Sequence, residues 1–390
     1  MNHADLARLN LQLNRRRFLS GLGVVSAAGL LAACGRGGDA GTATAGAPSG
    51  ASGGKKLVIG SIVPTLDAQF WQRYKDFTET VASALGIELI TVNANNSGDK
   101  LSRGVDDLVA RKVDGLIFVP YFGAGPKGIA TTDAANIVSM CVDTTPEDIV
   151  PGGDFPNYIG FVGPDDETAG FNMADALSKT MTAGPGGKKK IVAIQGTPGT
   201  SVAINRYKGL ERYIAEGGDL ELQGEAVGNF VAGDSQKAMD DLLQRSPDTQ
   251  GVWCANGGTA TGAIAALTNA GKKAGTDVKV VTMDLNPDNV ELVGTGEIAF
   301  DTGGHWLQGG FSLIIMHDWL NGKKIADDKR SQIIKLLPVT KATLAQLEAD
   351  YPQGQPDYDV KEHSRVFTPD GPDAVVELEY SKPVELGLVP

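Results

Sequence analysis

The feature that most constrains the fold is a regular alternation of short apolar runs with longer amphipathic stretches, which begins at Leu57 and is repeated once. The apolar runs are rich in β-branched residues and have the length of buried strands, whereas the stretches between them carry apolar residues at helical spacing. Strands separated by single helices form right-handed βαβ units and parallel sheets. We therefore predict an α/β chain with two Rossmann-like lobes.

The expected strands fall into two sets, separated by a loop at 183–187. They are 57–63, 87–92, 115–119, 137–142 and 158–162 in the first set, and 189–195, 220–227, 251–255 and 278–283 in the second. Two more are expected at 298–302 and 333–339, before a polar tail expected to be extended along the surface. A length of 390 residues exceeds the size at which one core keeps growing, which also favours two lobes.

The N-terminus indicates export. Three consecutive arginines, Arg15 to Arg17, precede an apolar stretch at 21–33 that is too short and glycine-rich for a stable transmembrane helix. The pattern resembles a twin-arginine signal, and Leu31-Ala32-Ala33-Cys34 resembles a lipobox in which Cys34 is lipidated. The alternative is a chance cysteine after an ordinary signal. We expect a lipoprotein leader at 1–33 and a flexible tether of Gly, Ala, Ser and Thr at 34–56.

Charge and cysteine content exclude some classes of partner. The formal net charge is −12, and loss of a leader with four arginines and one aspartate makes the chain more acidic still. An acidic surface argues against nucleic acid as a partner, because Lys and Arg supply most of that affinity. Cys141 and Cys254 lie inside apolar runs and are expected to be buried free thiols, and no Cys/His spacing suggests a metal.

The stretch from Leu57 to Trp71 is the first candidate for a binding site. A strand ends at Pro64, and the loop after it places Asp67, Phe70 and Trp71 at the start of an amphipathic helix. In open parallel sheets, ligands lie outside the carboxyl ends of the strands. A carboxylate beside two aromatic rings at this position favours a small-molecule site, although the helical spacing of Phe70 also fits a core residue.

Two aspartates occupy similar positions in the two halves. Asp143 and Asp284 each follow an apolar strand and begin the shared pattern D-x-x-P-[DE]-[DN]. Both residues also fit ordinary turns, in which Asp and Pro are common. Equivalent positions in two similar lobes would place two carboxylates opposite each other across a cleft, and we favour this interpretation.

The chain resembles the periplasmic solute-binding proteins of sugar ABC transporters, of the ribose-binding type, over about 57–341. The resemblance rests on motifs in a fixed order: Thr65-Leu66-Asp67 with Phe70-Trp71, Val142-Asp143, Gln195-Gly196 with Gly199-Thr200-Ser201 and Arg206, Ala255-Asn256, and Met283-Asp284. It implies a type I fold with a three-crossing hinge near 162–168, 303–306 and 336–341. The implied segments are an N-terminal lobe of 57–164 plus 305–336, a C-terminal lobe of 165–304 plus 337–341, and an extension at 342–390.

The resemblance also implies roles for individual residues. Phe70 and Trp71 would stack on a sugar ring, with Phe230 as a further aromatic face. The residues that would hydrogen-bond hydroxyl groups are Asp143, Arg206, Asn256 and Asp284. On the residues alone, Arg206 also fits a solvated helix face, and Asn256 fits a backbone role before Gly257.

Four positions depart from the ribose-binding pattern, which argues against ribose itself. Ala68 and Val119 replace asparagines, Thr144 replaces an arginine, and Gly304 replaces a hinge glutamine. We expect Asp67 to substitute for one lost contact, and His305 and Trp306 to supply polar and aromatic bulk beside Gly304.

The predicted function is capture of a sugar or polyol and its delivery to ABC permease subunits by a monomer without cofactor. The alternatives are a sensor or chemoreceptor partner, and a binder of another solute such as a nucleoside. An enzyme is disfavoured, since neither a dinucleotide fingerprint nor a nucleophile elbow nor a P-loop is present. A sugar-responsive transcription regulator of this fold would carry a helix-turn-helix in place of the leader.

Overall fold

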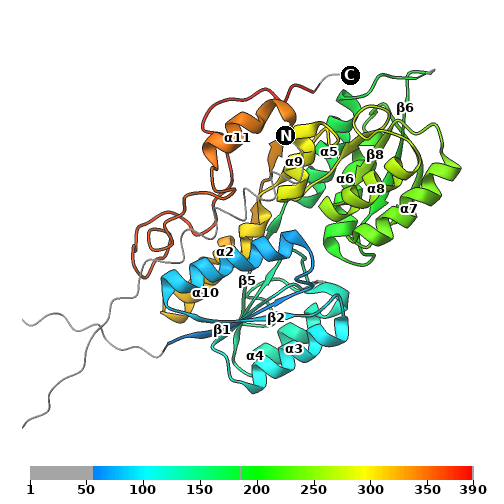
Figure 1. Cartoon of the computed structure of the whole chain (residues 1–390). Coiled ribbons are helices and arrows are strands. Elements are labelled where there is room, and N and C mark those ends of the chain that lie inside the picture. The colour runs from blue at the N-terminus through cyan, green and yellow to red at the C-terminus, as the bar shows by residue number, and fades with distance from the viewer. Residues whose placement is uncertain (1–55, 147, 185, 389–390) are drawn as a thin grey trace, which may run out of the picture. The chain divides into compact units, whose positions relative to one another are not determined.

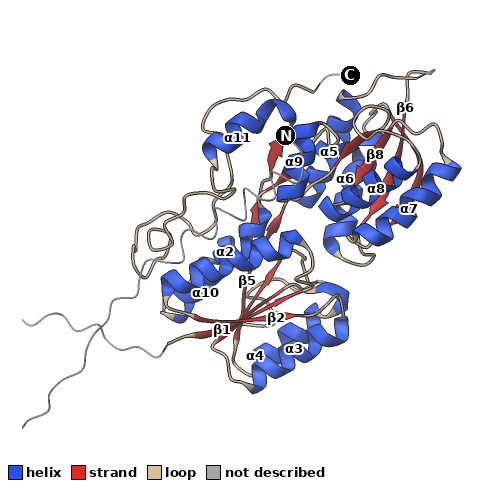
Figure 2. Cartoon of the chain, in the orientation of Figure 1, coloured by secondary structure: helices blue, strands red, loops and turns tan. Residues whose placement is uncertain are grey.

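The computed structural model describes residues 56–146, 148–184 and 186–388. The predicted leader at 1–33, the lipidation site Cys34 and all of the tether except Lys56 lie outside the described residues. Within the described part the chain forms two α/β lobes and a C-terminal extension (Figures 1 and 2).

A six-stranded parallel sheet forms the centre of the N-terminal lobe. Its strands, in spatial order, are β11 (Ser331–Ile334), β5 (Tyr158–Pro164), β4 (Val138–Val142), β3 (Gly115–Phe118), β1 (Val58–Val63) and β2 (Glu88–Asn93). The strands β3, β4 and β5 are buried along their whole length, which explains their nearly continuous apolar sequences. All carboxyl ends therefore lie at one edge of this sheet.

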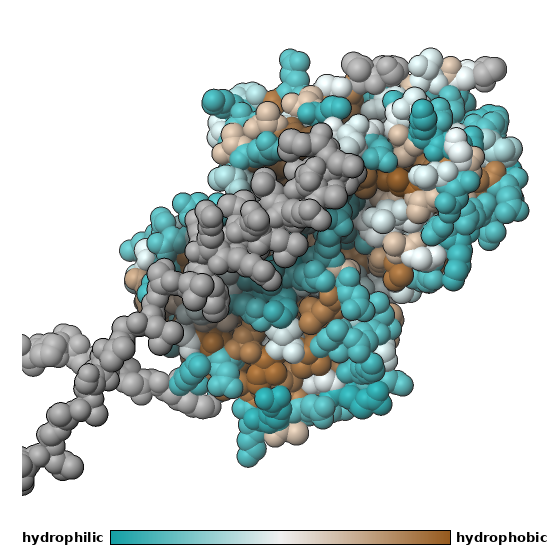
Figure 3. All heavy atoms as spheres, viewed as in Figure 1, coloured by the Kyte–Doolittle hydropathy of each residue, from teal (hydrophilic) through white to brown (hydrophobic). Residues whose placement is uncertain are grey.

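Helices cover both faces of this sheet. One pair consists of α2 (Gln69–Leu85) and α10 (Gln308–Leu320), and the other of α3 (Gly98–Ala110) and α4 (Gly125–Ala134). The helix α2 buries its predicted apolar stripe and ends at Gly86, whose φ of 70° is the left-handed conformation of a helix C-cap. Hydrophilic side chains gather over α3 on the visible face (Figure 3).

The C-terminal lobe repeats the arrangement with a four-stranded parallel sheet. Its strands in spatial order are β7 (Leu220–Val227), β6 (Lys189–Gln195), β8 (Gly251–Cys254) and β9 (Lys279–Val281). Its helices are α5 (Asp166–Lys179), α6 (Ser201–Ala215), α7 (Ala232–Arg245), α8 (Gly257–Asn269) and α9 (Pro287–Thr295). The helix α5 packs on α6 and α7 packs on α8, so the lobe is a three-layer sandwich.

The chain passes between the two sheets three times. It does so after β5, between β10 (Asp301–Gly303) and a 3₁₀ helix at His305–Leu307, and between β11 and β12 (Leu337–Val339). The prediction of a single strand at 333–339 is wrong. This segment is two strands, because β11 joins the N-terminal sheet whereas β12 pairs antiparallel with β10.

The C-terminal extension is more structured than a surface tail. It begins with α11 (Leu344–Asp350) and continues without helix or strand, while Val360 and Leu378 are buried against the core. Asp318 of α10 anchors it, because its carboxylate accepts hydrogen bonds from Ser364 Oγ and from the Arg365 N–H, both at 2.6 Å. The middle of the extension is thus packed on the N-terminal lobe, whereas Leu386 and Leu388 near its end pack against the core of the C-terminal lobe.

This anchor gives a first prediction. Asp318→Ala leaves the buried Ser364 hydroxyl and the Arg365 N–H without their charged acceptor, and should lower the free energy of unfolding by roughly 2–3 kcal/mol. Urea unfolding and limited proteolysis measure the effect, with faster cleavage expected within 351–376. Asp328→Ala, which changes an exposed aspartate nearby, is the control. Equal cleavage rates in the two variants would contradict the anchoring role.

Candidate functional site

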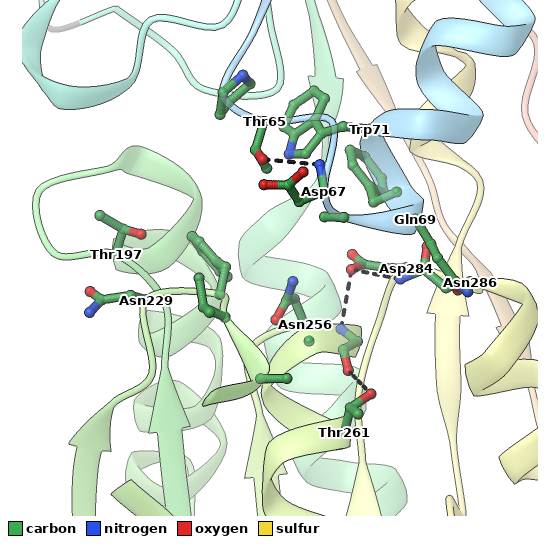
Figure 4. A pocket seen from close by; sticks show the side chains of 18 of the residues that line it. Thr65, Asp67, Gln69, Trp71, Thr197, Asn229, Asn256, Thr261, Asp284 and Asn286 are labelled. Carbon is green, nitrogen blue, oxygen red and sulfur yellow. Dashed lines mark hydrogen bonds between the residues drawn. The ribbon is translucent and has the colours of Figure 1, made fainter. Parts of the chain in front are cut away.

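A cavity of about 410 Å³ lies at the carboxyl ends of the strands of both sheets. Nine of the predicted site residues line it: Asp67, Phe70, Trp71, Asp143, Arg206, Phe230, Asn256, Asp284 and His305. Figure 4 shows Asp67 and Trp71 reaching in from one side, with Asn256 and Asp284 on the opposite side. The tenth residue, Trp306, is buried but is not among the lining residues.

The wall on the side of the N-terminal lobe is aromatic. Phe70 and Trp71 lie in the first turn of α2, with ring centroids 4.9 Å apart and perpendicular planes. Tyr121, which follows β3, lies edge-on to Trp71 at 6.4 Å, and His305 lies 4.5 Å from Phe70. Aromatic faces held in this way present apolar surface to a ligand while their own packing fixes their orientation.

Asp143 supplies a carboxylate from the N-terminal lobe. It follows β4 with a φ of 68°, an uncommon conformation that turns the chain sharply at the sheet edge. Its carboxylate accepts hydrogen bonds from the Tyr121 hydroxyl at 3.0 Å and from Gln308 Nε2 at 3.3 Å. Burial raises the pKa of Asp143 above its ordinary value, and Arg206 and these two donors oppose the shift.

Asp284 is the corresponding carboxylate of the C-terminal lobe. It has a φ of 118°, and the next residue, Leu285, also has a positive φ of 53°. Its carboxylate accepts a hydrogen bond from the Gly257 N–H at 3.1 Å, and His305 Nε2 lies 3.8 Å away. Burial raises the pKa of Asp284 to about 7, and Arg206 is the main opposing influence.

Arg206 is the cation of the cavity. It lies on α6, its Nε donates to Asp166 Oδ1 at 2.7 Å, and its Nη1 donates to the Ala255 carbonyl at 3.0 Å. Burial alone would lower the pKa of Arg206, but the carboxylates of Asp166, Asp284 and Asp143 outweigh it and raise the pKa. Burial likewise raises the pKa of Asp166 to about 7 against the influence of Arg206. The guanidinium is therefore charged and fixed in position.

A close crossing of α5 and α6 brings Arg206 to Asp166. A Cβ atom at Gly170 of α5 would overlap the Arg206 carbonyl, and one at Gly209 of α6 would overlap the Glu167 carbonyl. Only glycine allows the two helix backbones to approach so closely. The pair of residues thus depends on two glycines that have no role in the cavity themselves.

Asn256 has the backbone role expected from the sequence and also lines the cavity. Its side chain caps α8 by accepting a hydrogen bond from the Thr259 N–H at 2.9 Å, and the Asn256 N–H donates in turn to Thr259 Oγ1. The same side chain lines the cavity. The cap therefore holds Asn256 in one orientation at the edge of the site.

His305 and Trp306, at the second crossing between the lobes, have different surroundings. His305 lines the cavity. Burial lowers the pKa of His305 well below its ordinary value, and the positive charges of Arg206 and Arg73 lower it further. Its imidazole is therefore neutral at pH 7. Trp306 instead packs beneath the guanidinium of Arg73, which lies 3.4 Å from its ring centroid. Trp306 supports a neighbouring cation and does not line the cavity.

Several lining residues were missed by the sequence reasoning. Tyr121 follows Pro120 at the end of β3, and the strand-end rule that selected Asp143 would also have found it. Asn286 and Asn289, at the start of α9, are buried and line the cavity. Asn286 Oδ1 and Asn289 Nδ2 have no hydrogen-bond partner among the described residues. One is an acceptor and the other a donor, which suits a ligand hydroxyl.

The charges of the cavity select among ligands. Three buried carboxylates, those of Asp143, Asp166 and Asp284, surround one guanidinium, and only Asp166 forms an ion pair with it. The other two carboxylates accept hydrogen bonds and still have lone pairs available. The site is therefore suited to hydroxyl groups, which donate to carboxylates, and unsuited to phosphates or carboxylates, which they would repel.

Two α/β lobes with a polar and aromatic cavity at facing strand ends define a solute-binding protein. A family model described as periplasmic binding protein domain matches residues 59–324, and the chain belongs to this family. The family consists of solute-binding proteins and not of enzymes, and this confirms both the resemblance and the prediction of a non-enzyme.

Membership of this family implies export. Among the described residues, no helix has the length and apolar character to cross a membrane.

Individual relatives of the chain are also solute-binding proteins. The chain is 30% identical over 226 residues to a xylitol-binding protein of Mycolicibacterium smegmatis, covering 57% of this chain and 60% of that protein. It is 27% identical to a ribose import binding protein of Bacillus subtilis, covering 71% of this chain and 86% of the relative. The chain thus spans less than two thirds of the xylitol-binding relative and most of the ribose-binding one.

Solved structures confirm the predicted fold class. A periplasmic sugar-binding protein from Pseudomonas fluorescens superposes with a TM-score of 0.73 at 24% identity, covering 82% of this chain and 98% of that structure. A galactofuranose-binding protein gives a TM-score of 0.69 at 21% identity, covering 76% and 99%.

The buried carboxylates give a second prediction. Because burial raises the pKa of Asp284 to about 7, the folded chain holds a proton there that the unfolded chain, with a pKa of about 3.9, has released. Stability of the ligand-free protein should therefore fall as pH rises from about 4 to about 7. Asp284→Asn should make this fall shallower, since Asp143 and Asp166 still contribute to it, and should stabilise the protein at pH 8 by about 2 kcal/mol.

Urea unfolding at several pH values measures this effect. Asp107→Asn, at an exposed position of α3, is the control and should follow the wild type. The same pH slope in wild type and Asp284→Asn would show that Asp284 is not a buried, raised carboxyl group.

Proposed function

We propose that this chain captures an uncharged sugar or polyol in the cavity between its lobes and delivers it to an ABC importer. The observation that carries the proposal is the pair of buried carboxylates, Asp143 and Asp284, contributed by opposite lobes beside the rings of Phe70 and Trp71. Carboxylates bind hydroxyl groups and aromatic faces cover the apolar C–H surface of a sugar. The relatives that bind ribose and xylitol support this class of ligand.

The proposed mechanism is closure of the lobes around the ligand. Asp143, Phe70 and Trp71 would hold it on one side, while Arg206, Asn256 and Asp284 hold it on the other. A ligand that contacts both lobes favours the closed arrangement by its differential affinity. Membrane permease subunits would then recognise the closed form. Asp67, Phe230 and His305 line the same cavity and complete the proposed set of contacts.

A thermal-shift screen tests the ligand class. The panel is xylitol, D-ribose, D-allose, D-tagatose and myo-inositol, with D-ribose 5-phosphate and D-gluconate as anionic counterparts. A ligand at about 1,000 times its dissociation constant stabilises by about 4 kcal/mol, which raises the melting temperature by several degrees. We expect a selective rise with at least one uncharged member and none with the anions.

Variants connect a positive result to the cavity. Asp284→Ala should abolish the rise, whereas Asp107→Ala should leave it unchanged. An unaltered rise in Asp284→Ala would place the ligand elsewhere. A shift with an anion and with no uncharged compound would overturn the proposed ligand class.

The N-terminus leads us to propose that the protein is a lipoprotein held at the outer face of the cytoplasmic membrane. Cys34 in its lipobox-like sequence, after the twin-arginine-like stretch, supports this anchoring. In cells, Cys34→Ala should move the protein from the membrane fraction to the soluble exported fraction, as measured by fractionation and immunoblotting. Substitution of the buried Cys141 by Ala is the control and should not change the distribution. Equal membrane retention of Cys34→Ala would contradict lipidation.

A further inference from the structure

Arg73 joins three parts of the chain that are distant in sequence. It lies on α2 of the N-terminal lobe, close to Phe70 and Trp71. Its Nη1 donates to the carbonyl of Leu285 at 2.5 Å, and its Nη2 donates to the carbonyl of Gly354 in the C-terminal extension. Leu285 follows β9, so the first bond runs from one lobe to the other.

The guanidinium of Arg73 is held in place by Trp306. The ring of Trp306 lies 3.4 Å from the guanidinium carbon and is itself buried at the second crossing between the lobes. An arginine stacked on an aromatic face keeps the N–H groups at its edge free for hydrogen bonds. Burial lowers the pKa of Arg73 to about 10, with Asp301 and Asp284 opposing, so the group is charged at pH 7.

The acceptor, Leu285, belongs to the binding loop. It directly follows Asp284, both residues have positive φ, and its N–H donates to Asp301 Oδ1 at 3.3 Å. Positive φ at two successive non-glycine residues is held only by surrounding contacts. Arg73 therefore contacts the loop that carries one of the two cavity carboxylates. Since α2 and β9 lie in different lobes, separation of the lobes would break this bond.

We propose that Arg73 is a positioning residue that latches the two lobes together and makes the C-terminal extension part of the closed state. This inference rests on the proposed function. An apparent affinity equals the intrinsic affinity multiplied by the fraction of protein that is competent to bind. A bond formed only when the lobes are together raises the closed fraction, and it must break before a ligand escapes. The latch thus slows release.

Pulsed electron spin resonance on the ligand-free protein tests the latch directly. Spin labels at Lys127→Cys and Lys237→Cys, both exposed and on different lobes, report the separation of the lobes, with Cys34 replaced by Ser to avoid a third label. Arg73→Met keeps an apolar stem on Trp306 but removes both hydrogen bonds. Arg103→Met, an exposed change on α3, is the matched control.

The latch predicts a longer and broader distance distribution in Arg73→Met than in the wild type or Arg103→Met. It also predicts faster release of the panel compound that stabilises the wild type, by about tenfold in koff. Arg73→Lys keeps the charge and can reach one carbonyl, so its distances and its koff should lie between those of the wild type and those of Arg73→Met. Unchanged distances in Arg73→Met would overturn the latch, even if affinity fell.

These measurements separate the two proposals. If no compound of the panel binds the wild type, the proposed ligand class fails, while the distances in ligand-free protein still decide the latch. If Arg73→Met does not fold, as judged by circular dichroism, Arg73→Lys decides in the same way. Wild-type distances and a wild-type koff in Arg73→Lys would then overturn it.

Discussion

The cavity depends on a single buried guanidinium, that of Arg206, among three buried carboxylates. Each carboxylate would cost several kcal/mol of desolvation if it were ionised and unpaired. Arg206 neutralises one of them through its 2.7 Å bond to Asp166 and lowers the pKa of the other two. Those two are left with lone pairs directed at the cavity. This excess of acceptors is the basis on which we propose a ligand whose groups donate hydrogen bonds.

The two lobes position their cavity carboxylates through a similar backbone feature, a positive φ. Asp143 and Asp284 both follow a buried strand and both adopt a positive φ, of 68° and 118°. Such conformations cost of order 1–3 kcal/mol each and persist where surrounding contacts fix them, here the Tyr121 hydroxyl for one and the Gly257 N–H for the other. At both positions the backbone conformation directs the carboxylate toward the cavity at a cost in local stability.

The fold and about half of the site follow from rules that act locally along the sequence. Strand ends mark Asp143, Asp284 and Tyr121, and helix capping explains Asn256. Contacts between distant residues do not follow. Arg206 meets Asp166 only because α5 and α6 cross at two glycines, and the acceptors of Arg73 lie 212 and 281 positions further along the chain. The apolar run at 333–339 divides into two strands because its two ends pair in different sheets.

The proposed closure of the cavity would balance opposing electrostatic effects. Asp143 raises the pKa of Asp284, so the two carboxylates repel each other when the lobes approach. In the proposed mechanism this repulsion would oppose closure in the absence of ligand, with Arg206 as the opposing influence. Ligand hydroxyls would donate to both carboxylates and remove the penalty, which makes closure conditional on the correct ligand. The proposed latch at Arg73 acts on the backbone of the same loop, at the Leu285 carbonyl next to Asp284, and would add to the stability of the closed arrangement without itself contacting the ligand.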